Sequence, residues 1–314
     1  MPDPHHPTPG LLRPQDTLAA LHVLIGLALL SGGLAAAASG STLLYVVGQV
    51  LLALGFTQAL VLAHEAGHRT LFRSRGLNDA VGTVATFVAL LPYPCWRPIH
   101  ARHHRYTGWQ DLDATTESLV PRTLSRFERT AVNLAWRGWI PLFSILYRVR
   151  NYWQLGRIQP FLPTHLNTRR LRWAIRLQLL AYAALIAWTG VLETLMLIGP
   201  ALYLALAFQD ILLLSQHTHM PSHLSQGEAV TPFPPRAQGP FTRSLALPSG
   251  LSWLLLHFDA HERHHLYPAV PGYLLKKLPD HSPNTVHWLT WLREVKRLSG
   301  EKFLFGGPHP EIRR

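Results

Sequence analysis

Three histidine clusters contain the residues of this sequence best suited to chemistry. The first, HEAGH at 64–68, places histidines at positions i and i+4, which lie one turn apart on one face of a helix. The second, HARHH at 100–104, and the third, HERHH at 261–265, place histidines at i, i+3 and i+4. Within such a cluster, two imidazoles can serve one metal ion while the third serves another. Eight histidines are too many for one ion, so the clusters predict a site for two.

The number of histidines also bears on which metal is bound. Imidazole nitrogen suits zinc, copper, iron and nickel. Zinc needs only three or four ligands, whereas iron with nitrogen ligands can activate dioxygen. HEAGH also fits the HExxH pattern of zinc proteases, with Glu65 as the base. Such a protease would not require the two later clusters, so the pattern favours iron.

Four long apolar runs must position these clusters. They cover about residues 18–38, 43–63, 177–191 and 192–214, and a bilayer core needs about 20 apolar residues per helix. The runs are joined in pairs by short turns, so each pair forms a helical hairpin. The predicted fold class is an all-α integral membrane protein with four transmembrane helices in two hairpins. Clusters of histidines follow the second and fourth helices directly.

The remaining segments predict interfacial helices and a helical cap. The apolar stretch 81–92 is too short to span comfortably, which favours a re-entrant or interfacial helix. Residues 121–176 are basic and contain tryptophans, a composition typical of helices at lipid headgroups. Both hairpins return the chain to one side of the membrane. Since Lys and Arg concentrate between the apolar runs, we expect a multi-pass protein whose cap carries the histidines on the cytosolic side.

Composition narrows the class further. The 314 residues carry a net charge of +12 from 29 Lys and Arg, but no helix-turn-helix or zinc-finger motif accompanies it, so nucleic acid is not expected as a partner. The single cysteine, Cys95, excludes a disulfide framework and a multi-cysteine zinc or iron–sulfur site. We expect one domain at 17–280, a polar N-terminal tail at 1–16 and a C-terminal cytosolic tail at 281–314.

From about His64 to Leu278 the sequence resembles the membrane fatty-acid desaturase family. AHEAGH at 63–68 is similar to the first histidine box of the acyl-lipid delta-12 type, and residues 77–108 are similar to the stretch leading into the second box. SQHTHMP at 215–221 resembles a further element of that subgroup. HERHHLYPAVPGY at 261–273 resembles the third box and the residues that follow it.

The resemblance implies nine metal ligands around a di-iron centre. The predicted ligands are His64, His68, His100, His103, His104, His217, His261, His264 and His265. His217 is chosen as the ninth because it follows Gln216, and His219 is its rival. His257 departs from the family pattern and is expected to be a structural residue or to support a ligand.

Four carboxylates near the clusters have two possible roles. Asp111, Asp113, Asp259 and Glu65 either accept the second N–H of a ligand imidazole, which would orient its ring, or lie in solvated loops. The sequence leaves both roles open.

The activity that the resemblance implies is O2-dependent desaturation. Two irons would activate dioxygen, and the loss of two hydrogens from neighbouring carbons would leave a cis double bond in an acyl chain carried by a membrane lipid or a thioester. The two electrons must come from a separate ferredoxin or cytochrome b5-like donor, because the chain has no haem or flavin motif and one cysteine. The basic cytosolic surface would suit an acidic donor.

Other functions remain open. A carotenoid hydroxylase or ketolase, or an alkane hydroxylase, belongs to the same superfamily, although the motifs after the fourth run and the third cluster favour the desaturase. A metal transporter or sensor is the alternative that is not an enzyme. Transporters place ionisable residues inside their spans, whereas these runs hold few before Gln209 and Asp210.

Overall fold

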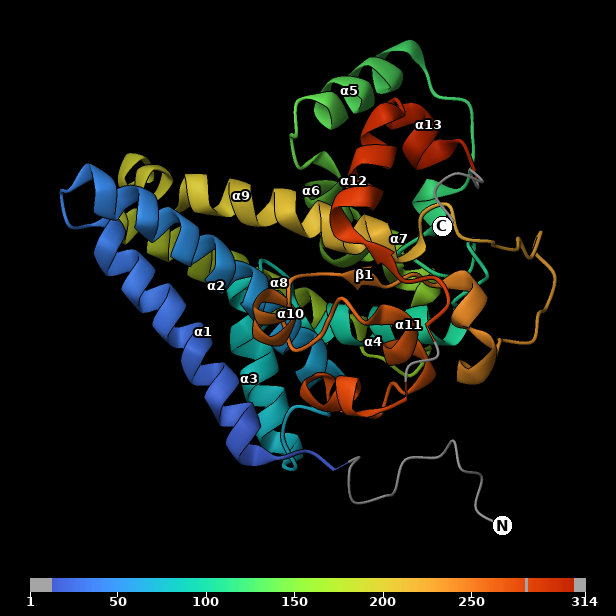
Figure 1. Cartoon of the computed structure of the whole chain (residues 1–314), viewed down its shortest axis with the longest axis horizontal. Helices are drawn as coiled ribbons and strands as arrows, with labels where there is room; N and C mark the ends of the chain where they lie inside the picture. Colours follow the sequence, from blue (N-terminus) through green and yellow to red (C-terminus); the bar gives the residue numbers. More distant parts are fainter. Residues whose placement is uncertain (1–12, 280–281, 308–314) are drawn as a thin grey trace.

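A computed structural model of the chain describes residues 13–279 and 282–307 (Figure 1). This part is mostly helical, which agrees with the all-α prediction. The strands assigned in it are β1 (Leu245–Ala246) and β2 (Val286–His287), which pair in parallel. Their pairing joins the segment after α9 to the segment before α12.

The first two long helices form the predicted hairpin. Helix α1 (Asp16–Ala37) and helix α2 (Thr42–His68) lie side by side, and the Ser41 side chain accepts a hydrogen bond from Leu44 N to begin α2. Their backbones approach closely at Gly48, where an added Cβ would lie 2.5 Å from Ala37 N. Small residues at such a crossing let two apolar helices pack without lipid between them.

The second pair is α8 (Thr168–Thr189) and α9 (Val191–His217), separated by Gly190 with φ +87°. In the described part of the chain, three helices are long and apolar enough to cross a membrane, namely α1, α2 and α9. Helix α8 has 22 residues, but its N-terminal half carries four arginines. The structure therefore supports three of the four predicted spans, and α8 as a span remains a prediction.

Helices α2 and α9 are held together by a polar contact between two apolar helices. Gln49 on α2 donates to Leu197 O (2.9 Å) and accepts from Ala201 N (2.8 Å) on α9. Pro200 lies inside α9 at this place and cannot donate a backbone hydrogen bond. The Gln49 amide therefore satisfies backbone groups next to an irregular turn of the helix.

Two shorter helices follow α2. Helix α3 (Arg75–Val88) packs beside α2, and Ser74 caps its start by accepting from Leu77 N. Its second half covers most of the stretch predicted as an interfacial or re-entrant helix. Helix α4 (Tyr93–Tyr106) then begins directly after Pro92. The Tyr93 hydroxyl donates to Ala66 O (3.3 Å), which fixes α4 against the last turns of α2.

The rest of the described chain forms the cap and its connections. The remaining helices are α5 (Arg126–Arg137), α6 (Leu142–Arg148), the π-helix η3 (Val149–Trp153), α7 (Leu155–Ile158), α10 (Ser249–Leu254), α11 (His261–Leu266), α12 (Trp288–Arg297) and α13 (Gly300–Phe305). Short 3-10 helices occur at η2 (Glu117–Leu119), η4 (Gln159–Phe161), η5 (Pro235–Ala237), η6 (Gly239–Phe241) and η7 (Gly272–Lys277). Helix α5 carries a capping box made by Ser125 and Glu128.

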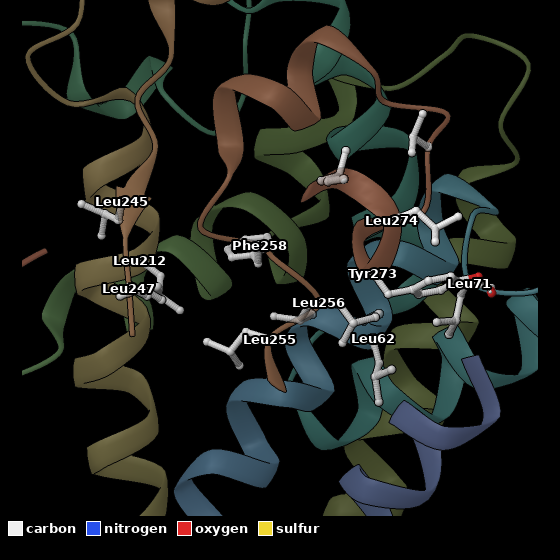
Figure 2. Close-up of a cluster of buried hydrophobic side chains, with 14 of the residues drawn as sticks. Leu62, Leu71, Leu212, Leu245, Leu247, Leu255, Leu256, Phe258, Tyr273 and Leu274 are labelled. Atoms are coloured by element: carbon white, nitrogen blue, oxygen red, sulfur yellow. Dashed lines mark hydrogen bonds between the residues drawn. The ribbon is translucent and has the colours of Figure 1, made fainter. Parts of the chain in front are cut away.

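The cap packs on the ends of α2 and α9. Figure 2 shows Leu62 of α2 next to Leu256, with Leu255 and Phe258 on the side of Leu256 that faces Leu212 of α9, and all five belong to one core cluster. All five side chains are buried. Burying a Leu or Phe side chain contributes about 1.5–3 kcal/mol relative to leaving it exposed. This core therefore fixes the segment before the third histidine cluster against the helices that carry the first cluster and His217.

Candidate metal centre

The fold brings all nine predicted histidines together in two groups. The first group is His64, His68, His100, His104 and His264, and the second is His103, His217, His261 and His265. Within each group the possible ligand atoms lie within 4.8 Å of one another. The last turns of α2 and α9 supply three of these residues, while α4 and α11 supply the other six.

The division between the groups follows helical geometry. On α4, His100 and His104 belong to the first group and His103 to the second; on α11, His261 and His265 belong to the second group and His264 to the first. Residues at i and i+4 differ by about 40° around a helix of 3.6 residues per turn, whereas i+3 lies about 60° to the other side. Both α4 and α11 therefore contribute to both groups.

The ring nitrogens converge at metal-binding distances. The Nε2 atoms of His68 and His100 are 2.8 Å apart, those of His100 and His104 are 3.2 Å apart, and those of His104 and His264 are 3.1 Å apart. Two imidazole nitrogens at about 2.0–2.1 Å from one ion, as for zinc, would lie about 3 Å apart at a right angle. The donor atoms present therefore fit a shared cation.

Two buried ring nitrogens point to the same conclusion. His64 Nε2 and His265 Nε2, one from each group, have no hydrogen-bond partner among the described residues. A buried polar atom without a partner costs about 1–3 kcal/mol. A metal ion in each group would satisfy these nitrogens, and the all-imidazole donor set suits iron.

Four of the imidazoles are oriented by an acceptor behind them. His103 Nδ1 donates to Asp113 Oδ2 (2.7 Å) and His64 Nδ1 to Glu65 Oε1 (3.0 Å). His217 Nδ1 donates to a backbone oxygen, Phe241 O (3.1 Å), and His265 Nδ1 to the side chain of Gln238 (2.9 Å). Each acceptor holds the proton on Nδ1 and leaves Nε2 available for a metal.

The four carboxylates left open by the sequence divide into two pairs. Asp113 and Glu65 contact histidines of the site, as above. Asp111 instead accepts from Ser225 N (3.0 Å) and Ser225 Oγ (2.5 Å), and Asp259 accepts from Ser252 Oγ (2.6 Å). These two carboxylates hold loops in place.

His257 and His219 lie outside both groups. His257 Nδ1 contacts Ser252 Oγ at 2.9 Å, in the same network as Asp259. His219 Nε2 donates to Phe303 O at 2.7 Å. Of the two rivals for the ninth position, the structure brings His217 into a group and directs His219 to α13.

Burial keeps three histidines of the two groups neutral. It lowers the pKa of His104, His261 and His264 well below the ordinary value of 6.5, and the neighbouring imidazoles lower it further. Neutral imidazoles are the form that binds metal. The site is therefore ready to accept a cation at neutral pH without first releasing protons from these three rings.

A cavity of about 120 Å³ adjoins both groups. Six histidines line it: His64, His100, His103, His217 and His261 belong to the two groups, and His219 lies outside them. Its apolar wall includes Leu60, Trp96, Phe143, Tyr147, Leu213, Leu214, Phe241, Phe258, Phe303 and Leu304. Leu60 and Trp96 are buried while Pro121 and Ser222, which also line it, are exposed, so the cavity leads from the histidines to the surface.

Sequence reasoning missed Gln238 and Thr115. Gln238 Nε2 donates to His104 O (2.8 Å) while its oxygen accepts from His265, and Thr115 N donates to Asp113 Oδ1 (2.9 Å). Neither residue stands at a fixed spacing from a histidine cluster. Gln238 lies in a Pro- and Gly-containing loop, where only the folded structure reveals its role.

Comparison with known proteins identifies the family. Residues 40–288 match the family described as Fatty acid desaturase. The sn-1 oleoyl-lipid 12-desaturase of Anabaena variabilis is 21% identical over 253 residues, covering 77% of this chain and 69% of that protein. A fatty acid desaturase of Bacillus subtilis is 25% identical over 253 residues, covering 76% of this chain and 68% of that protein.

A fungal relative matches more closely over a short stretch. The Delta(12) fatty acid desaturase of Mortierella isabellina is 41% identical over 66 residues, which is 21% of this chain and 16% of that protein. The family match extends over most of the chain, and the chain belongs to the fatty acid desaturase family. It is an oxidoreductase of lipid metabolism, as the histidine clusters and their flanking motifs predict, and these matches give no support to the hydroxylase, ketolase or transporter alternatives.

Proposed function

We propose that this chain is a di-iron desaturase that introduces a cis double bond into the acyl chain of a membrane lipid. The observation that carries the proposal is the pair of histidine groups facing one cavity. Each group would hold one iron, and the nine histidines of the two groups would be the ligands of the two irons. Bound iron would supply the O2 chemistry, in which two electrons and O2 allow two hydrogens to be removed from neighbouring carbons.

The protein's own residues would position the ions and the chain. Asp113 and Glu65 hold the rings of His103 and His64, and the Trp96 ring stacks on His100 with centroids 4.7 Å apart. The apolar wall of the cavity would bind methylenes, each contributing about 0.8 kcal/mol on burial. The same wall would keep water from the reacting carbons.

The name of one relative supports the acyl-lipid substrate, and the names of two support position 12. The Anabaena protein is named for an oleoyl lipid and position 12, and the Mortierella protein for the same position. We extend this to the present chain as an acyl-lipid desaturase of the 12 type. An acyl thioester is the alternative substrate within the same chemistry.

The membrane arrangement forms part of the proposal. Helix α8 would be a fourth span beside α1, α2 and α9, with its arginines at the headgroups of the membrane. The two histidine groups, which include the histidines at the ends of α2 and α9, would face the cytosol, since the basic segments flank the same helix ends. The spans and the cap would form one domain, 17–280, with residues 281–314 as a C-terminal segment on the cytosolic side.

A separate electron donor is required. Arg105, which is exposed, lies next to the partly exposed His104 on α4, and Arg102 lies one turn earlier on the same helix. An acidic ferredoxin or cytochrome b5-like protein would be attracted to such a surface. Turnover should then fall as ionic strength rises, and turnover that is insensitive to salt would count against this part of the proposal.

Expression in a host with a simple lipid composition tests the activity. New cis-unsaturated acyl chains in membrane lipids are expected, and oxygenated carotenoids with unchanged acyl chains would overturn the proposal. The purified protein should contain two irons per chain. His104→Ala should abolish desaturation, whereas His165→Ala, at an exposed histidine outside both groups, should retain it.

A further inference from the structure

Helix α13 forms part of the cavity wall beside the histidines. Phe303 and Leu304 of α13, with Gly307 just after it, line the cavity that faces both histidine groups. Phe303 is only 2% exposed, whereas Leu304 is partly buried. All three residues lie beyond residue 288, where the family match ends. The family match therefore gives no role to this part of the cavity wall.

Helix α13 is fixed to α5 by polar and aromatic contacts. Glu301 N donates to Asn133 Oδ1 (2.8 Å), and the Glu301 carboxylate pairs with Arg129 (3.1 Å). The ring of Phe303 stacks on Trp136 with centroids 4.4 Å apart. Figure 1 shows α5 and α13 side by side at one end of the molecule. Contacts of several kinds therefore hold α13 in one position against the cavity.

His219 connects α13 to the metal centre. Its Nε2 donates to Phe303 O (2.7 Å), and its ring stacks on the Phe303 ring with an interplanar angle of 18°. His217, two residues earlier, belongs to the second histidine group. The short segment 217–219 therefore contains both a histidine of the second group and the histidine that contacts α13.

We propose that α13 is a specificity-determining wall, and that Leu304, held in place through His219 and Phe303, sets how far an acyl chain can extend past the histidines. This inference rests on the proposed desaturase function. Leu304 is partly buried, directly follows the buried Phe303 on α13 and lines the same cavity, as does Gly307 three residues later. A larger or smaller side chain at 304 changes the space along the path that the chain must follow.

The size of the effect follows from apolar pocket selectivity. One methylene more or less in such a pocket changes selectivity by about 10–200-fold. Leu304→Trp should therefore favour shorter acyl chains over longer ones by at least about tenfold relative to the native protein. Leu304→Ala should shift the preference in the opposite direction and move the double bond by at least one carbon in part of the product.

The experiment compares four purified variants with the native protein. Leu304→Trp and Leu304→Ala change the wall, and His219→Phe removes the donor to Phe303 O while keeping a ring. Lys302→Ala, at an exposed position on the same helix, is the matched control. Iron content is measured for each variant, together with the chain length and double-bond position of the products. Displacement of a fluorescent acyl probe by saturated acyl chains of increasing length measures selectivity without turnover.

The outcomes separate this inference from the proposed function. Altered chain-length selectivity in the two Leu304 variants and in His219→Phe, with native iron content and an unchanged Lys302→Ala, is the expected result. Unchanged selectivity in both Leu304 variants would overturn the inference, even if the native protein desaturates lipids. Loss of iron in His219→Phe would instead assign His219 to the metal centre and also overturn it. A native protein that makes no unsaturated product but whose probe displacement depends on residue 304 would refute the proposed function alone.

Discussion

Replacing Asp113 by Asn should weaken one of the two proposed metal sites. Asp113 is buried and both of its oxygens accept hydrogen bonds, Oδ2 from His103 Nδ1 (2.7 Å) and Oδ1 from Thr115 N and Oγ1 (2.9 Å each). Asn has one oxygen and one amide nitrogen, which only donates. Whichever way the amide is turned, its NH2 group faces an N–H donor, so the Asn loses either its bond to His103 Nδ1 or its bond to Thr115 N.

The magnitude can be worked out from the lost bond. A hydrogen bond to a charged group contributes about 1.5–3 kcal/mol, and 1.4 kcal/mol corresponds to about tenfold in affinity. Metal affinity at the group that contains His103 should therefore fall by about 10–100-fold, the range found when the partner of a metal-bound histidine is removed. In the other group, Glu65 and not Asp113 orients a histidine ring, so the metal affinity of that group should be much less affected.

Iron titration against a competing chelator measures both sites. The native protein should bind two ions with similar strength, and Asp113→Asn should bind one of them more weakly. Asp111→Asn is the matched control, because Asp111 also follows the second cluster but contacts Ser225. The reasoning is refuted if Asp113→Asn binds both ions as tightly as the native protein, or if Asp111→Asn is equally impaired.

Three further predictions follow from contacts around the centre. Glu65→Gln should lose iron from the first group, because Glu65 accepts hydrogen bonds from His64 and from Gly272 N (2.7 Å), and the NH2 group of Gln would face one of these donors. Chelator titration measures the loss, and loss of iron from the second group instead would contradict the prediction. Gly67→Ala should lower the unfolding temperature and the iron content, because the added Cβ would lie 2.3 Å from the Trp96 ring and overpacking costs about 1–3 kcal/mol. Gly76→Ala is the control and should be tolerated, because its added Cβ would have no contact closer than 3.8 Å. Metal-free protein should lose stability as pH falls below about 6.5, because burial lowers the pKa of His104, His261 and His264 in the folded protein and the unfolded chain therefore binds more protons. Thermal unfolding across this pH range measures the loss, and an unfolding temperature that does not change with pH would contradict the prediction.

Much of the centre could be predicted because helical spacing is a local property. The i and i+4 positions of each cluster indicate which histidines share a face, and the structure places all nine predicted histidines in two groups. The division of α4 and α11 between both groups follows from the same spacing. The choice of His217 over His219 is based on its place directly after Gln216, and the structure brings His217, but not His219, into one of the groups.

Contacts between distant segments could not be predicted in this way. Asp111 and Asp113 stand two residues apart after the same cluster, yet one binds a loop residue more than a hundred positions later and the other binds His103. Gln238 reaches His265 from a loop without regular spacing. The span predicted at 177–191 differs for another reason: four arginines in the N-terminal half of α8 shorten its apolar length, so α8 is not among the helices apolar enough to cross a membrane.

The distribution of the ligands has a consequence for the order in which the protein is made. The first group takes residues from α2, α4 and α11, and the second from α4, α9 and α11. During synthesis both groups therefore wait for the same late helix, α11, after the long apolar helices have already left the ribosome. A nascent chain that stops before residue 261 would have neither group complete. Completion of both proposed metal sites should accordingly be a late event in maturation, which would fasten the cap to helices that entered the membrane earlier.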